Sequence, residues 1–128
     1  MHRLQTPERE IQELLNFVRV NEASDLHLKV GYAPFVRIGG HLRKVDSAPL
    51  PNSEFIESMI VPFVPKERKK EYARHGGVDF AIKTEHGDRF RVNLFRSGGE
   101  MHVALRRVQG KLPDFESLNL PPIYRQML

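Results

Sequence analysis

The sequence predicts an α+β domain with a mostly antiparallel sheet of about six strands flanked by helices. Two patterns support this prediction. Segments with apolar residues at helical spacing separate two groups of segments in which apolar and polar residues alternate. Short glycine-containing links join the alternating segments within each group, as in β-hairpins. The expected order is therefore one helix, three strands, two helices, three strands and a linker.

The first helix is expected to begin at Thr6-Pro7-Glu8 and to end near Asn21. Thr6 can cap the helix, Pro7 suits its first position, and Glu8 favours its positive end. Four apolar residues then follow helical spacing: Ile11, Leu14, Leu15 and Val18. Residues 25–30, 35–38 and 41–45 are expected to be strands, with a hairpin turn at Gly39-Gly40 between the last two.

A second helix is expected to begin at Asn52 or Ser53 and to stop at Pro62. Residues 66–75 form a third, strongly charged helix, with Tyr72 and Ala73 as its expected contacts and Gly76-Gly77 as its end. The last three strands are expected at residues 78–84, 89–96 and 101–108, joined by hairpin turns.

Composition narrows the possible functions. The chain has 128 residues, of which 40% are hydrophobic and 28% charged, as in a folded globular domain. A net charge of +4 is compatible with a phosphate-bearing partner without requiring one. No stretch approaches the roughly 20 apolar residues that cross a bilayer. The N-terminus lacks the pattern of a secretion signal, so the cytoplasm is the expected compartment.

Several catalytic motifs are absent from the sequence. There is no G-x-x-x-x-G-K-[ST] phosphate-binding loop and no G-x-S-x-G nucleophile motif. The chain has no cysteine, which excludes disulfides and thiolate chemistry. Its six histidines are scattered without metal-ligand spacing, so no metal site is expected. The chain by itself is therefore not expected to be an enzyme.

The clearest candidate for binding is the strand that contains Arg89, Arg91 and Asn93, which share one face. Guanidinium groups form bidentate hydrogen bonds with phosphate oxygens, so these side chains together can bind an anion. The alternative is a solvated sheet face with cross-strand charge pairs. Four further arginines are expected to extend the basic surface: Arg37, Arg43, Arg106 and Arg107.

A second candidate pair is Asp25 and His27, two positions apart on the first strand. The two side chains can be functional, or they can simply hydrogen-bond to a neighbouring turn, and the structural interpretation is preferred.

Two ordered sets of residues carry a resemblance to a known family. The first is Ala-Ser-Asp-Leu-His-Leu at 23–28, followed by Gly31, Pro34, Arg37-Ile38, Gly40 and Leu42-Arg43. The second is Asp79-Phe80, Arg-Phe-Arg-Val-Asn at 89–93, Phe95, Arg106 and Leu120-Pro121. In these features the chain resembles the N-terminal domain of the PilT-like type IV pilus retraction ATPases, within the type II and type IV secretion ATPase family.

The resemblance implies a PAS-like N-terminal domain over residues 1–112. Residues 113–128 would then be a linker and the start of a missing RecA-like ATPase domain that carries the phosphate-binding loop. It also implies that Arg89, Arg91 and Arg106 sense the nucleotide phosphates. The remaining family-motif residues are expected to be structural: Asp25, His27, Arg37, Gly40 and Asn93.

The resemblance further implies a full-length parent that is a hexameric ATPase using ATP and Mg²⁺ in pilus retraction and twitching motility. The expected partners are the RecA-like domain of the same or a neighbouring subunit and a pilus or secretion platform protein in the inner membrane. The parent would be cytoplasmic and peripheral at that membrane.

Two alternatives to the motor domain are considered. A nucleic-acid-binding module would need aromatic side chains beside the arginines, and only Phe95 is expected on their face, so nucleic acid is not the expected partner. A PAS-like sensory module would need an internal apolar cavity.

Overall fold

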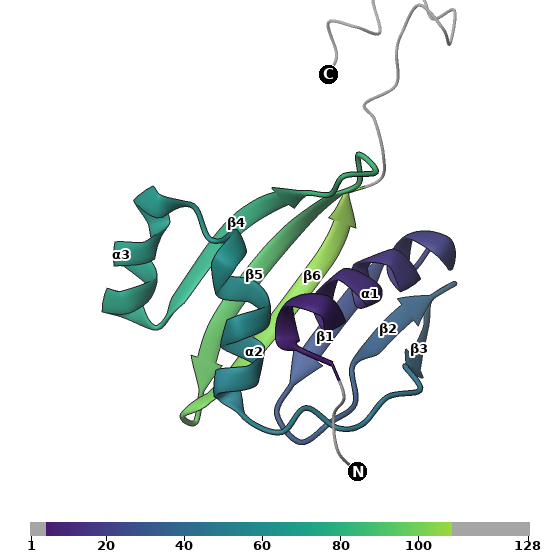
Figure 1. Cartoon of the computed structure of the whole chain (residues 1–128), viewed down its shortest axis with the longest axis horizontal. Coiled ribbons are helices and arrows are strands. Elements are labelled where there is room, and N and C mark those ends of the chain that lie inside the picture. Colours follow the sequence, from purple (N-terminus) through teal and green to yellow (C-terminus); the bar gives the residue numbers. More distant parts are fainter. Residues whose placement is uncertain (1–4, 109–128) are drawn as a thin grey trace, which may run out of the picture.

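A computed structural model describes residues 5–108, which form one six-stranded antiparallel sheet in the order β3-β2-β1-β6-β5-β4. Helices α1 and α2 lie across one face of this sheet, and α3 lies at one end, beyond β4 (Figure 1). The predicted α+β class, element order and mostly antiparallel sheet are confirmed. The linker predicted at residues 113–128 lies outside the described residues.

The first helix, α1, spans Pro7–Val20. The hydroxyl of Thr6 accepts a hydrogen bond from the backbone N–H of Arg9 at 3.2 Å, which satisfies one of the free donors at the start of the helix. The four apolar residues at helical spacing are all buried against the sheet. The capping residue and the helical spacing of the apolar residues therefore predict the position of this helix correctly.

The first strand group consists of β1 (Asp25–Lys29), β2 (Phe35–Ile38) and β3 (His41–Lys44). The turn between β2 and β3 is made by Gly39 and Gly40, whose φ angles are 57° and 82°. Both values lie in the left-handed region that glycine adopts without a steric cost, as a two-residue hairpin turn requires.

Helix α2 spans Ser53–Ile60, and the side chain of Asn52 caps it by accepting the backbone N–H of Phe55 at 2.8 Å. A 3₁₀ turn at Val61–Phe63 leads into α3, which spans Lys66–His75. Gly76 ends α3 in the left-handed conformation, with φ of 71°. No residue of α3 is buried, which follows from its highly charged sequence.

One predicted contact of α3 is wrong. Tyr72 packs against the core, but Ala73 is exposed. The two residues are adjacent, and consecutive helix positions point in different directions, so only one of them can face the sheet.

The second strand group consists of β4 (Gly77–Lys83), β5 (Arg89–Ser97) and β6 (Glu100–Val108). The two groups join where β1 pairs antiparallel with β6. This pairing makes one continuous sheet. Buried residues alternate along these strands and form a single core with α1 and α2. None of the helices within residues 5–108 is long and apolar enough to span a membrane.

Candidate anion-binding site on the open sheet face

We call the sheet face opposite α1 and α2 the open face. The strand register places four charged residues in one row across it, on β2, β1, β6 and β5 in turn: Arg37, Asp25, Arg106 and Arg91. Direct cross-strand neighbours have Cβ atoms about 5 Å apart, so these side chains can interact. The row brings residues from both strand groups into one site.

Asp25 is the centre of this row and its side chain is only 12% exposed. Its carboxylate accepts hydrogen bonds from the Ser24 hydroxyl at 2.7 Å and from Nε of Arg106 at 3.2 Å, and Nε of Arg37 lies 4.0 Å away. Burial alone would raise the pKa of Asp25. The hydrogen bonds from Ser24 and Arg106 and the charge of Arg106 outweigh burial and hold this pKa below its ordinary value. Asp25 is therefore ionised at neutral pH and orients Arg106.

Arg91 and Arg106 lie directly opposite each other on β5 and β6. The Arg106 side chain is 77% exposed although its Nε is held by Asp25. Arg91 is also exposed, and within residues 5–108 it forms no ion pair. Two adjacent guanidinium groups, one of them without a carboxylate partner, provide donors for an anion from solution or from another domain.

A groove of about 490 Å³ runs over these two arginines. Arg68, from α3, also lines this groove, because α3 lies beside the edge strand β4. Asp25 and Asp79 also line the groove, so three guanidinium groups face two carboxylates. Arg68 was not predicted as a site residue, since nothing in its local sequence shows that α3 lies beside the edge strand.

Asn93 and Asp79 face each other on β5 and β4, and the Asn93 amide donates a hydrogen bond to the Asp79 carboxylate. Asn93 is thus engaged within the sheet, as expected of a structural motif residue. Two more of the predicted structural residues meet at the hairpin between β2 and β3, where Arg37 donates a hydrogen bond to the carbonyl oxygen of Gly40 at 2.8 Å. This bond ties the Arg37 side chain to the β2–β3 turn.

His27 lies on the open face, one row from Asp25, and its ring stacks on Phe35 with centroids 5.0 Å apart. Burial lowers the pKa of His27, the charges of Arg37 and Arg106 lower it further, and the charge of Asp25 opposes them. His27 is therefore neutral near pH 7.

A second stack, with centroids 5.2 Å apart, joins Phe95 and His102 on the same face. The prediction that Phe95 is the only aromatic beside the arginines is wrong, because the register with His27 places Phe35 there as well.

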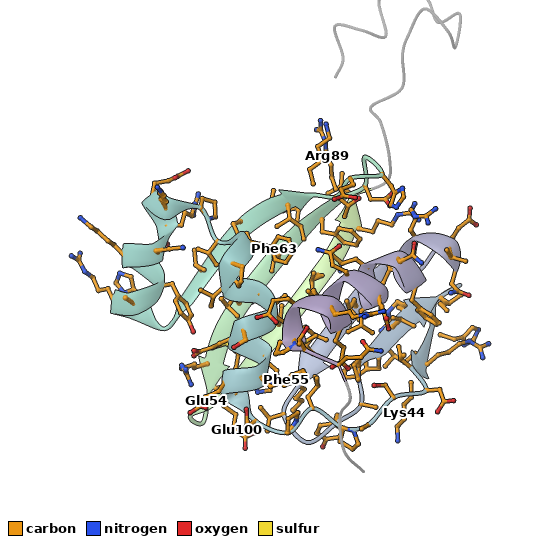
Figure 2. The ribbon with its side chains drawn as sticks, viewed as in Figure 1. Lys44, Glu54, Phe55, Phe63, Arg89 and Glu100 are labelled. Carbon is orange, nitrogen blue, oxygen red and sulfur yellow. The ribbon has the colours of Figure 1, made fainter. Side chains whose placement is uncertain are left out.

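Arg89 shares the open face with Arg91 but lies at the end of β5, opposite Val108, and does not line the groove. Figure 2 shows its side chain extending outward at that end of the sheet. The structure therefore groups Arg91 with Arg106 and leaves Arg89 at the margin.

Two of the predicted extensions of the basic surface are wrong. Arg107 pairs with the buried Phe90 and so lies on the helix-covered face, where it donates to Asp88 at 3.2 Å. Arg43 pairs with the buried Val36 and also lies on that side. Adjacent strand residues point to opposite faces, so only one of Arg106 and Arg107 can belong to the open face. On β3, the residue opposite Arg37 is Leu42, which leaves the next residue, Arg43, on the other face.

Comparisons with known proteins agree with this fold. No protein-family model matches the chain. The type IV pilus retraction ATPase PilT of Pseudomonas aeruginosa is 27% identical over 118 residues, which are 92% of this chain and 34% of that protein. The type IV pilus ATPase PilU of the same species is 26% identical over 92% of this chain and 31% of that protein.

Two solved structures are also similar. A crystal structure of the pilus retraction motor PilT with bound ADP superposes with a TM-score of 0.72 at 28% identity, covering 90% of this chain and 34% of that chain. The ATPase DotB of Legionella pneumophila superposes with a TM-score of 0.71 at 20% identity, covering 97% of this chain and 35% of that chain, and supports the fold alone.

The chain thus spans about a third of the length of the curated relatives it matches. It is homologous to PilT and PilU, and the similarity is to the N-terminal portion of these ATPases. The resemblance predicted from the motif residues is confirmed.

Proposed function

We propose that this chain is the N-terminal domain of a hexameric secretion-motor ATPase of the PilT kind, and that its open face neutralises the phosphates of ATP held on a RecA-like domain. The observation that supports this proposal is the adjacent pair Arg91 and Arg106 over an open groove. That domain belongs to the same subunit or to its neighbour.

The contacts of Arg106 suit this role. Asp25 uses only Nε of the guanidinium group, so both terminal nitrogens remain available to phosphate oxygens. Because Asp25 is itself held by Ser24, it fixes the direction of Arg106 before a phosphate arrives. Such preorganised positive charge stabilises the charge that develops on a transferred phosphoryl group. Arg91 adds a second guanidinium group, and Arg89 extends the group of arginines by one row.

The remaining components of the motor lie outside the described residues. Within residues 5–108, no three histidine or carboxylate side chains come together as a metal-ligand set. In this proposal Mg²⁺ and the phosphate-binding loop belong to the RecA-like domain. In this proposal the assembled motor is cytoplasmic, docks on an inner-membrane pilus or secretion platform protein, and drives pilus retraction and twitching motility.

The test is ATP turnover by the parent protein that contains this chain. Replacing Arg106 or Arg91 by Ala should each lower kcat by about 10- to 100-fold, because a hydrogen bond to a charged group contributes about 1.5–3 kcal/mol. Arg43→Ala is the matched control, since it removes the same charge from the opposite side of the sheet. The isolated chain should hydrolyse no ATP. Unchanged turnover after separate removal of Arg89, Arg91 and Arg106 would refute the phosphate role.

A second candidate function is binding of single-stranded nucleic acid. It is favoured by Phe95, which is 38% exposed on the open face of β5, the strand that also carries Arg89 and Arg91. Titration of the chain with a single-stranded oligonucleotide at several salt concentrations discriminates the two functions. Affinity that falls steeply with salt and is lost in Phe95→Ala would support this candidate, whereas the motor proposal predicts no dependence on Phe95.

A further inference from the structure

The row of charged residues on the open face ends at a small residue. Beyond Arg91 on β5, the next position in the row is Ala81 on the edge strand β4, directly opposite Arg91. Ala81 is exposed and lines the same groove as Arg91 and Arg106. Its methyl group leaves room above β4 that a longer side chain would fill.

Arg68 lines this groove from α3, which lies beyond β4 (Figure 1). Of the ten residues of α3, all of which the structure describes, Arg68 alone lines the groove. Ala81 on β4 is thus flanked by β5, which carries Arg91, and by α3, which carries Arg68. Arginines from two separate elements therefore border one opening.

The position of α3 depends on Tyr72, four residues after Arg68. The Tyr72 ring packs against the core, and its hydroxyl donates a hydrogen bond to Glu57 of α2 at 2.8 Å. Glu57 also accepts a hydrogen bond from Arg96 of β5. Residues four positions apart lie on the same side of a helix. The contact that holds Tyr72 therefore keeps Arg68 on the side of α3 that faces the domain.

The ion pair that Arg68 forms within residues 5–108 is weak. Its partner is Glu71 on the same helix, at 3.5 Å, and the two side chains are 46% and 48% exposed. An exposed pair of this kind contributes little stability. A phosphate oxygen can therefore replace Glu71 at Arg68 with little loss.

The two carboxylates that line the groove already accept hydrogen bonds. Asp25 accepts from Ser24 and Arg106, and Asp79 accepts from Asn93. Three arginines and two carboxylates line the groove, so it keeps a net positive charge.

We infer that Arg68 is a third phosphate-binding residue, which together with Arg91 and Arg106 makes the groove a site for an oligophosphate chain. This role rests on the proposed nucleotide function and extends it from the strands to α3. Three guanidinium groups suit an oligophosphate because each can bind oxygens of a different phosphate. The chain of phosphates lies over Ala81, in reach of Arg91 and Arg68.

The test is isothermal titration calorimetry of the 128-residue chain with tripolyphosphate, which lacks the base and sugar of ATP. The unchanged chain should bind tripolyphosphate more tightly than inorganic phosphate, which is too short to engage all three arginines. Arg68→Gln should weaken tripolyphosphate binding about 10-fold. This is the lower end of what a hydrogen bond to a charged group contributes, because the Arg68 side chain is partly screened by solvent.

The matched control is Arg74→Gln, which removes the same charge from the same helix. Arg74 lies two positions after Tyr72, about 200° around the helix, so it is on the side that faces away from the domain. It is exposed and does not line the groove. This variant should weaken binding by no more than about twofold, because solvent and salt screen its charge. Circular dichroism should show that each variant is folded.

A second variant, Ala81→Leu, tests the geometry without a change of charge. The leucine side chain would occupy the room above β4, so it should weaken tripolyphosphate binding. Its control is Ala73→Leu, at an exposed alanine of α3 that does not line the groove. That variant should bind like the unchanged chain.

Three results would overturn the inference: no binding of tripolyphosphate to the unchanged chain, unchanged binding in Arg68→Gln, or equal losses in Arg68→Gln and Arg74→Gln. ATP turnover by the parent protein separates this inference from the motor proposal. If Arg91→Ala and Arg106→Ala lower turnover while any of these three results is found, the role of Arg68 is wrong and the motor proposal stands.

Discussion

Replacing Asp25 by Asn removes a negative charge that is surrounded by three polar side chains. The side chain is 12% exposed, and it bonds to Ser24 and Arg106 with Arg37 nearby. A hydrogen bond to a charged group contributes about 1.5–3 kcal/mol when shielded. Arg106 is 77% exposed, so solvent screens its share. We therefore expect the free energy of unfolding to fall by about 1–2 kcal/mol, or about 4–8 °C in Tm.

The pH dependence of this loss identifies its cause. The folded pKa of Asp25 lies below the ordinary value of 3.8, so its ionised form stabilises the folded state above that pH. This contribution is lost as the pH falls through the lower, folded pKa. In urea unfolding, the difference between the parent chain and Asp25→Asn should be full at neutral pH and should be lost as the pH falls through the folded pKa of Asp25, below 3.8.

The control for this prediction is Asp46→Asn, at an exposed carboxylate that forms no ion pair within residues 5–108. Its unfolding free energy at neutral pH should match that of the parent chain, because its side chain is exposed and lies in no ion pair of the described residues. If Asp25→Asn were as stable as the parent at neutral pH, or if the difference persisted unchanged in acid, Asp25 would not be the charged centre of the row.

Three further predictions concern neighbouring parts of the fold. Asn52→Ala removes the cap of α2 and should cost about 1 kcal/mol of unfolding free energy in urea titrations. Burial and the hydrogen bond to Glu57 raise the pKa of Tyr72 to about 12. Tyr72→Phe should therefore remove the most alkaline step from the tyrosine absorbance titration. Glu57→Gln should shift that step to lower pH. The proton NMR titration of His27 should have a midpoint below 6.5, and Phe35→Ala should raise that midpoint by admitting water to the ring.

The elements of the fold could be predicted because their signals are local. Thr6 and Asn52 cap helices through bonds to residues three positions away, and Gly39-Gly40 forms its turn through its own backbone conformation. The alternation of Arg89, Phe90 and Arg91 likewise assigns each residue to a face without knowledge of its neighbours.

The site could be predicted only in part because its key contacts are distant in sequence. Asp25 and Arg106 are 81 positions apart and meet only because β1 pairs with β6. No local pattern specifies which strands of the two groups become neighbours, so the ion pair between them was not foreseen. Arg68 was missed for the same reason, since its place in the groove depends on how α3 packs at the sheet edge.

The errors on Arg43 and Arg107 have a different origin. Arg107 was assigned to the basic surface together with Arg106, and Arg43 as a residue of the first strand group. A shift of one residue along a strand moves a side chain to the opposite face, so neither assignment fixed the face. Once the register is known, Arg106 belongs with Arg91 and Arg107 belongs with Asp88.

The most direct test of the motor proposal is a structure of the parent protein with a non-hydrolysable ATP analogue bound. We predict that a guanidinium nitrogen of Arg91 or Arg106 lies about 3 Å from a phosphate oxygen, within hydrogen-bonding distance. Asp25 should still contact Nε of Arg106 in that state. A structure in which the open face points away from the nucleotide, with both arginines beyond reach of the phosphates, would contradict the proposed role of this domain.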